Sequence, residues 1–192
     1  MPKIVTLTLN PAVDKSCPVE QVVAERKLRC GEPAHHPGGG INVSRAIQKL
    51  GGESSVLWTC GGAIGELLRQ LLDGENLRHD PIAIGEMTRE NLIVFEESSG
   101  QQFRFGMPGA TLTETDVQTC LDRLQAIDPP PDYLVLSGSL PPGVDENFYA
   151  RLVHAALLPG RARYQRTALT AIGIYTSHNP LANNTLQADS CK

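Results

Sequence analysis

Three consecutive glycines stand directly before a helix pattern in the segment Pro37-Gly38-Gly39-Gly40-Ile41-Asn42-Val43. Consecutive glycines let the backbone adopt positive φ and approach a ligand closely, and the apolar spacing from Ile41 predicts the first turn of a helix. The free amides of a helix start attract anions, and the Asn42 side chain can donate to and accept from hydroxyl groups. The segment therefore predicts a site for an anion or a polyol. Taken alone, an ordinary glycine-rich turn before a helix explains it equally well.

The rest of the chain alternates between strand and helix patterns. Strand patterns cover residues 3–9, 54–59 and 133–136, and helix patterns cover residues 41–50, 66–72, 113–127 and 145–156. The run at 133–136 is apolar without interruption, which is typical of a strand buried on both faces of a parallel sheet. Thr113 and Asp116 suit the start of their helix as capping residues. We therefore expect an α/β fold with a mostly parallel sheet flanked by helices.

A second group of short strand patterns does not follow this alternation. Two of them, at 16–19 and 27–33, alternate only weakly, whereas those at 91–96 and 102–105 flank Ser98-Ser99-Gly100, a hairpin signal. We expect these four segments to form a small separate β sheet, a lid over the larger one. His35 and His36 are expected in a polar loop before the glycines, and no metal site is expected there, because adjacent histidines usually point apart.

The composition excludes several classes of function. The chain has 192 residues, 41% of them hydrophobic, which suits one medium globular domain with a core of its own. A net charge of −4 gives no field that would attract nucleic acid or an anionic membrane. No membrane span or signal peptide is indicated, and five cysteines without a close pair argue against a disulfide framework and against a zinc finger. We expect a cytoplasmic protein.

Two polar residues are expected at the carboxyl edge of the sheet. Asp14 follows the strand at 3–9, and Ser139 follows the strand at 133–136. Open α/β sheets bind ligands at this edge, where a carboxylate can accept hydrogen bonds from two sugar hydroxyls. An Asx-turn remains an alternative for Asp14, and a turn leading into a helix, built with Pro141-Pro142-Gly143, remains one for Ser139.

Several motifs occur together in the order of one protein family. They are Thr6-Leu7-Thr8-Leu9-Asn10-Pro11-Ala12-Val13-Asp14, Lys27-Leu28-Arg29-Cys30, Gly61-Gly62-Ala63-Ile64-Gly65, Thr88-Arg89-Glu90-Asn91 and Ser137-Gly138-Ser139-Leu140-Pro141-Pro142-Gly143. Over residues 1–156 the chain resembles the ribokinase-like (PfkB-type) sugar kinases, and within them the 6-phosphofructokinases. The resemblance implies a ribokinase-like fold, transfer of the ATP γ-phosphoryl group to fructose 6-phosphate with Mg²⁺, and a homodimer formed through the lid sheet.

The resemblance also implies a set of substrate-binding residues. Around the sugar it implies Asp14, Gly39, Gly40 and Asn42; at or near the phosphate it implies Lys27, Arg29, Arg89 and Arg104; Ser139 lies beside them at the sheet edge. Arginine suits the phosphate because its planar fork binds two oxygens and stays charged at any cellular pH. A solvated charge on the lid is the alternative for each arginine, and the position of Arg89 at the base of the hairpin favours binding.

The sequence departs from the family pattern at two places. The glycine turn has one residue fewer before Asn42, which shortens its reach by roughly 3 Å and is expected to weaken sugar binding. The Gly-Ala-Gly-Asp motif, which supplies the base and an anion hole in this family, and the Asn-x-x-Glu motif for magnesium and phosphates are both absent. We therefore assign no catalytic residue and no metal ligand, and expect the binding site for ATP and Mg²⁺ to be missing.

The resemblance ends at about residue 156. Residues 157–192 are expected to be an unrelated or frameshifted tail, with a strand at 168–175 and poor order from 177, and the strand at 133–136 is then expected near an unpaired edge. The leading hypothesis is an inactive amino-terminal part of a sugar kinase. The alternatives are a non-catalytic module that binds sugar phosphate or dimerises through its lid, and, more distantly, a fragment of a nucleotide-binding oxidoreductase.

Overall fold

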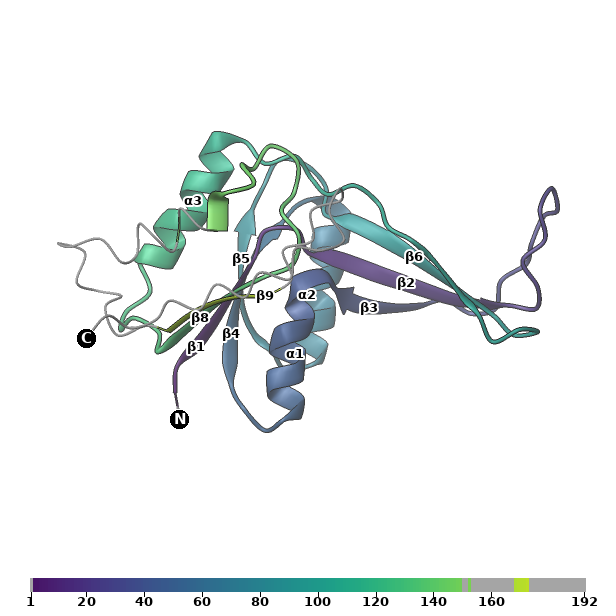
Figure 1. Ribbon diagram of the computed structural model, residues 1–192, viewed down its shortest axis with the longest axis horizontal. Coiled ribbons are helices and arrows are strands. Elements are labelled where there is room, and N and C mark those ends of the chain that lie inside the picture. The colour runs from purple at the N-terminus through teal and green to yellow at the C-terminus, as the bar shows by residue number, and fades with distance from the viewer. Residues whose placement is uncertain (1, 150–151, 153–167, 173–192) are drawn as a thin grey trace.

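The computed structural model describes residues 2–149, 152 and 168–172. These residues form an α/β body and a long lid that projects from one side of it (Figure 1). Among them no helix is both long enough and apolar enough to cross a membrane. The α/β body with a small second sheet confirms the fold class expected from the sequence.

The body is built on one parallel sheet of five strands. They are β1 (Ile4–Thr8), β4 (Ser54–Cys60), β5 (Arg78–Ala83), β8 (Tyr133–Ser137) and β9 (Ala168–Ile172), in the order β5-β4-β1-β8-β9. Strand β1 is central: Thr6 pairs with Val56 on one side and with Val135 on the other. Parallel strands covered on both faces are rich in apolar residues, which explains why β1, β4 and β8 could be recognised in the sequence.

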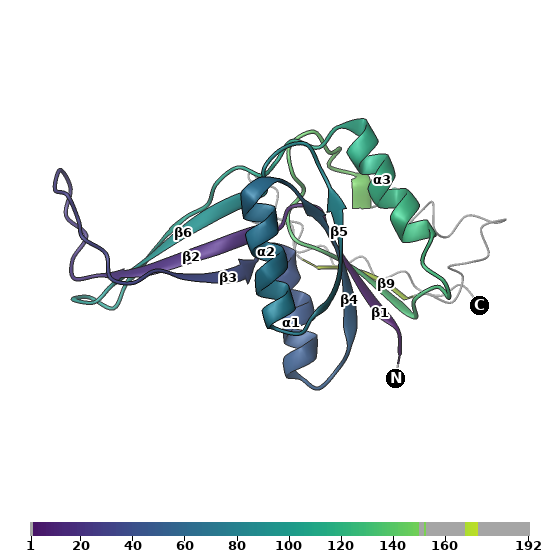
Figure 2. The ribbon, with the colours of Figure 1, turned by 180° about the vertical axis from the view of Figure 1, so that it is seen from behind.

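Helices cover both faces of this sheet. The 3₁₀ turn η1 (Gly39–Ile41), α1 (Asn42–Lys49) and α2 (Gly62–Gly74) lie on one face, and α3 (Glu114–Gln125) lies on the other (Figure 2). Ile41, Trp58 and Leu68 belong to the core cluster under α2, whereas Leu134 and Cys120 belong to the cluster under α3.

The caps of these helices confirm part of the sequence analysis. Thr113 accepts a hydrogen bond from the Asp116 amide, and the Asp116 carboxylate accepts one from the Thr113 amide, so the predicted capping residues form a reciprocal capping box. Of the helix expected at 145–156, Phe148, Tyr149 and Leu152 are helical and buried, and the remainder lies largely outside the described residues.

The lid is a four-stranded sheet, as expected, but two of its strands differ from the prediction. It contains β2 (Ala12–Val19), β3 (Ala34–Gly38), β6 (Arg89–Glu96) and β7 (Gln102–Phe105), in the order β3-β2-β6-β7. The segment at 16–19 is only the end of β2, which begins at Ala12. The strand expected at 27–33 is wrong, because residues 20–33 link β2 to β3 and the chain pairs again only from Ala34.

The histidines before the glycines are part of the lid, so the expected polar loop at His35 and His36 is wrong. His36 is the β3 partner of Asp14. His35 Nε2 lies 3.6 Å from Glu90 Oε1 on β6. Both histidines therefore belong to the paired backbone of β3, and His35 also contacts strand β6.

The edges of the body sheet were predicted in part. Strand β5, which the patterns missed, contains Pro81, and proline is tolerated in an edge strand because one side of β5 has no partner among the described residues. The strand at 133–136 does lie near an edge: β9 pairs with β8 in parallel along its whole length, and β9 is the outermost described strand on that side. The strand expected at 168–175 is confirmed as far as Ile172; residues 173–192 lie outside the described residues.

The glycine turn packs directly against the end of β8. A Cβ at Gly40 would lie 2.3 Å from the carbonyl oxygen of Ser137 and 2.7 Å from Thr8 Oγ1. In addition, Ser137 Oγ donates to the Gly40 carbonyl at 3.0 Å and lies 3.1 Å from Thr8 Oγ1. Only glycine therefore lets the turn rest on the ends of both central strands.

Replacing Gly40 by alanine should destabilise the chain. The added methyl group forces either the turn or the end of β8 to move, and overpacking of this kind costs about 1–3 kcal/mol. Gly74→Ala is the matched control, since the described residues beyond its own helix place no atom within 4 Å of the new methyl group, and alanine is preferred to glycine within helices. Urea unfolding followed by Trp58 fluorescence would measure both variants. A Gly40→Ala chain as stable as the wild type would contradict the close packing.

Candidate functional site

The candidate site lies where the lid meets the carboxyl edge of the body sheet. From β1 the chain builds the sheet outward through β4 to β5, and it returns to the other side of β1 at β8. The gap between the carboxyl ends of β1 and β8 is therefore the topological switch point, where open α/β sheets bind ligands. Asn10, just after β1, donates from Nδ2 to Ser139 Oγ, just after β8, at 2.9 Å. The two residues bridge this gap.

Asp14 belongs to the lid and not to the loop after β1. It is the third residue of β2, so the expectation that it directly follows the carboxyl end of a body strand is wrong. Asn10-Pro11 ends the first strand, as expected, and the chain then pairs again at once. The Asp14 side chain occupies space left by Gly38, where a Cβ would lie 2.5 Å from its carboxyl carbon. Its Oδ1 accepts a hydrogen bond from Asn91 Nδ2 at 2.8 Å.

Arg89 begins β6 at the base of the hairpin, as the sequence predicted. Its guanidinium donates to the carbonyl oxygens of Met107 and Asn10, each at 3.2 Å. The Nε atom is buried and has no hydrogen-bond partner among the described residues. Burial lowers the pKa of this guanidinium, and the negative charge of Asp14 opposes that shift. Arginine nevertheless stays charged in proteins, so the junction holds a partly desolvated cation with an unused donor.

Two asparagines complete this junction, and sequence reasoning did not assign them to the site. Asn91 donates to Asp14 and accepts from the Met107 amide at 3.1 Å, so it links the lid to the segment after β7. Asn10, which is buried, joins Arg89 to Ser139. Asn91 could have been identified from the sequence. Side chains two residues apart in a strand lie on the same face, and Asn91 follows Arg89 by two residues.

The glycine turn contributes backbone to the site, but Asn42 has another partner. Gly39 adopts φ of 68°, and its missing Cβ avoids a 3.1 Å contact with the Asn10 carbonyl oxygen. Asn42 Oδ1 accepts a hydrogen bond from Arg45 Nη1 at 2.9 Å. Arg45 in turn forms a two-point ion pair with Glu75, at 2.7 and 2.6 Å. In this arrangement Asn42 is exposed and engaged at the start of α1.

The structure separates the other predicted cations from Arg89. Lys27 and Arg29 are exposed in the link between β2 and β3, at the end of the lid far from the body (Figure 1). Arg104 lies on β7 opposite Ile93, which places it on the same lid face as Arg89 and Asn91, and it donates to Gln102 Oε1 at 3.3 Å. Of the four predicted phosphate-binding cations, Arg89 is the one that lies at the junction.

The junction network contains one carboxylate, that of Asp14. Within residues 2–149, 152 and 168–172, no three His, Cys, Asp or Glu side chains come together in a way that could hold a metal ion. In phosphoryl-transfer sites Mg²⁺ is held by one or two carboxylates together with substrate phosphates, so this arrangement by itself assigns no metal ligand.

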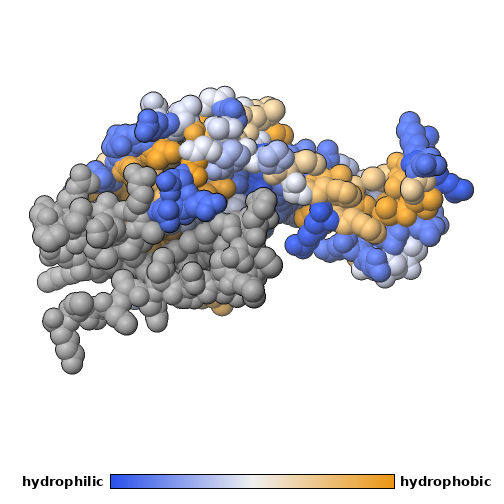
Figure 3. Space-filling view, turned by 45° about the horizontal axis from the view of Figure 1, so that its top comes forward, coloured by the Kyte–Doolittle hydropathy of each residue, from blue (hydrophilic) through white to orange (hydrophobic). Residues whose placement is uncertain are grey.

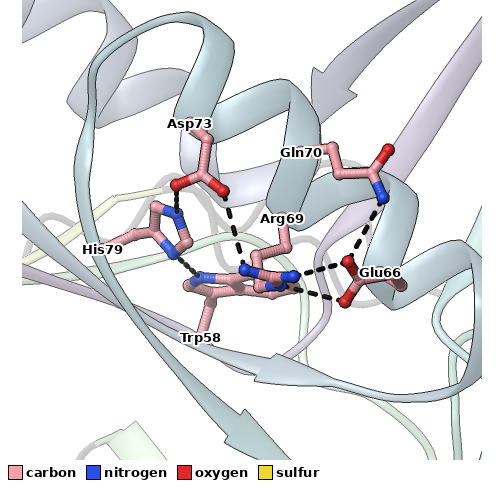
Figure 4. Close-up of polar contacts among 6 residues, drawn as sticks. All are labelled: Trp58, Glu66, Arg69, Gln70, Asp73 and His79. Carbon is pink, nitrogen blue, oxygen red and sulfur yellow. Dashed lines mark hydrogen bonds and ion pairs between the residues drawn. The ribbon is translucent and has the colours of Figure 1, made fainter.

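A separate polar cluster links β4 and β5 to α2 and serves packing (Figure 4). Trp58 Nε1 donates to His79 Nδ1 at 3.3 Å, and His79 Nε2 lies 3.1 Å from Asp73 Oδ1. Arg69 connects Asp73 to Glu66, on the exposed side of α2. This chain of contacts satisfies the indole N–H of a fully buried tryptophan, which would otherwise cost stability.

Known proteins share both the sequence and the fold. An ATP-dependent 6-phosphofructokinase isozyme 2 from Mycobacterium tuberculosis is 43% identical over 152 residues, which are 79% of this chain and 45% of that relative. The structure of Escherichia coli phosphofructokinase-2 in complex with fructose-6-phosphate matches with a TM-score of 0.79 and 41% identity, over 90% of this chain and 54% of that one. The tetrameric inhibited form of the same enzyme matches with a TM-score of 0.79 and 40% identity, over 89% and 54%.

The chain thus spans about half the length of the curated relatives it matches. The structural matches confirm the expected ribokinase-like fold. The family model for pfkB family carbohydrate kinases matches residues 5–168, beyond the expected limit at residue 156. Because this match covers most of the sequence, the chain belongs to the pfkB family of carbohydrate kinases.

Proposed function

We propose that the junction between lid and body binds a sugar phosphate, most specifically fructose 6-phosphate, as the acceptor site of a 6-phosphofructokinase-type kinase. The observation that carries this proposal is the connected network Asp14–Asn91–Met107–Arg89–Asn10–Ser139. It brings one carboxylate and one partly buried guanidinium together at the switch point of the sheet. A phosphorylated sugar offers the complementary groups, hydroxyls for the carboxylate and an anion for the guanidinium.

In this proposal each side chain has a separate task. Asp14 accepts hydrogen bonds from sugar hydroxyls, while Asn91 holds its carboxylate in place. Arg89 binds the phosphate, because its buried guanidinium loses less hydration than an exposed one and keeps a free donor. Ser139 and the backbone of Gly39 and Gly40 line the edge of the sheet beside the sugar. Lys27, Arg29 and Arg104 are proposed to reach the phosphate from the lid or from a second copy of it.

A lid-mediated dimer is a second proposal, favoured by the apolar surface of the lid. Figure 3 shows hydrophobic surface along the lid. Four large apolar side chains of the lid and its connecting segments are exposed, namely Leu28 at 36%, Phe95 at 41%, Phe105 at 47% and Met107 at 44%. Phe105 pairs with Leu92 and shares its face of the lid sheet, whereas Phe95 lies on the opposite face. Exposed apolar surface can mark interaction sites. The tetrameric form of Escherichia coli phosphofructokinase-2 supports self-association in this family.

We further propose that the 192-residue chain alone binds its acceptor without phosphorylating it. The family motifs for the base, the anion hole and magnesium are absent from the sequence, and no cluster of three His, Cys, Asp or Glu side chains occurs among the described residues. Phosphoryl transfer depends almost entirely on positioning and on neutralising charge on the phosphate. Loss of a general base typically costs about 10²–10⁴ in rate, and loss of an anion-hole donor about 10²–10³.

The acceptor site can be tested with Arg89→Ala. Hydrogen bonds to a charged group are worth about 1.5–3 kcal/mol, so we expect about 10- to 100-fold weaker binding of fructose 6-phosphate, measured by isothermal titration. Arg78→Ala is the matched control, because Arg78 is an exposed arginine on β5 whose nearest carboxylate, on Glu53, is 3.8 Å away. Wild-type chain that binds free fructose as tightly as fructose 6-phosphate would overturn the proposal.

The absence of turnover has its own assay. Purified chain, freed of host phosphofructokinase, should give a background rate with fructose 6-phosphate, ATP and Mg²⁺ in a coupled assay. An intact phosphofructokinase added to the same mixture is the positive control. Turnover above about 1 s⁻¹, the low end for ordinary enzymes, would show that the chain supplies its own base and nucleotide site.

The lid dimer predicts different effects for two exposed apolar residues. Phe105→Asp puts a charge on the lid and should shift sedimentation equilibrium towards monomer by at least about tenfold in dissociation constant. Leu50→Asp is the control, because Leu50 is 88% exposed at the end of α1 and away from the lid. Equal self-association of both variants and the wild type would argue against the lid as the interface.

A further inference from the structure

The link between β2 and β3 returns along the end of β2 and packs tightly against it. Gly31 N donates to the Pro18 carbonyl oxygen at 2.9 Å. A Cβ at Gly31 would lie 2.8 Å from Pro18 Cγ, so glycine is what permits the approach. The residues just before these two are Cys17 and Cys30. The backbone contact between Gly31 and Pro18 therefore brings the side chains of Cys17 and Cys30, one residue earlier in each segment, close to each other.

The two thiols have very different surroundings. Cys17 is buried in the lid cluster with Val19 and Val94, and Cys30 is exposed. Burial raises the pKa of the Cys17 thiol, the neighbouring Cys30 raises it further, and the charge of Lys15 opposes the shift. A reagent in solution therefore reaches Cys30 first, and Cys17 stands behind it as a second thiol.

The remaining cysteines of the described region have no such arrangement. Cys60 packs against the core cluster under α2, and Cys120 is buried in the cluster under α3. Burial raises the pKa of Cys120 to about 12, so its thiol stays protonated and unreactive at neutral pH. The pair at the end of the lid is thus distinguished by proximity and by access.

We propose that Cys17 and Cys30 form a reversible disulfide that fastens the β2–β3 link to the lid, with oxidised glutathione or another small disulfide as the oxidant. The Cys30 thiolate attacks one glutathione sulfur and releases the other as a thiol, which leaves a mixed disulfide on Cys30. Cys17 then loses its proton to solvent and attacks the Cys30 sulfur, which releases the second glutathione. Two protein thiols and one oxidised glutathione become one protein disulfide and two reduced glutathiones.

The disulfide would restrain the part of the lid that carries Lys27 and Arg29. Both residues lie in the link that the bond closes, so oxidation reduces the range of positions that their charges can occupy. Reduction frees the link again. This site does not depend on the proposed sugar-phosphate binding, because its chemistry and its test involve the thiols alone.

The experiment uses the full chain carrying Cys191→Ser, since Cys191 lies outside the described residues and could compete for Cys30. The chain is equilibrated in glutathione buffers of increasing oxidised fraction, quenched with acid, alkylated and mapped by mass spectrometry. We expect Cys17 and Cys30 to become protected together, while Cys60 stays alkylatable once the chain is unfolded. Brief trypsin cleavage after Arg26 or Lys27 should then give fragments that separate on a gel only after reduction.

Two variants test the order of the steps. Cys17→Ala should stop the reaction at the mixed disulfide and accumulate one glutathione on Cys30, whereas Cys60→Ser should behave as the parent does. Should Cys17→Ala fail to fold, the map of the parent chain still decides the question. Cys17 that remains alkylatable in fully oxidising buffer, or Cys30 linked to a second chain in place of Cys17, would overturn the proposal.

Discussion

The contact between the glycine turn and the end of β8 is the constraint on which the rest of the structure depends. Gly40 lies against the Ser137 carbonyl and Thr8, so a segment that leaves the lid through β3 is fixed between the two central strands. This contact sets where β3 ends and α1 begins. The same contact also fixes the position of the lid sheet relative to the body sheet. The distance between Asp14 on the lid and Ser139 on the body depends on that position. A side chain at this point would separate the two sheets that build the site.

The polar network at the junction follows from this geometry. Burying a guanidinium is costly unless its donors are satisfied, and two backbone carbonyls and the nearby charge of Asp14 offset part of the cost for Arg89. The Nε–H group of Arg89 is buried and has no hydrogen-bond acceptor among the described residues. An anion bound beside Arg89 would accept a hydrogen bond from this group and offset its positive charge. The buried guanidinium therefore costs stability in the free chain but favours a phosphorylated ligand.

Features with a local sequence signal could be predicted, and features that depend on pairing could not. The buried run of β8, the capping box at Thr113 and the β6–β7 hairpin each follow from a few neighbouring residues. Strand β5 is stable because it pairs with β4, although Pro81 interrupts its pattern. Asp14 and Arg89, which the sequence predicts as site residues, meet in one polar network. The partner of Asn42 could not be predicted, because Arg45 reaches it only once α1 has formed beside Glu75.

Under the proposed function, the contacts of the described residues would act equally on bound substrate and on the transition state. The hydrogen bonds that Asp14 would accept from sugar hydroxyls, and those that Arg89 would donate to a phosphate fixed on the sugar, would change little as a second phosphoryl group approaches. Contacts of that kind lower the dissociation constant without raising kcat. Rate enhancement requires groups aimed at the charge that develops on the transferred phosphoryl. In the described residues the junction supplies one cation, which donates to the Asn10 carbonyl, and one carboxylate, which accepts from Asn91. Under the proposed function this network selects and orients the sugar phosphate, and the chemical step needs groups beyond it.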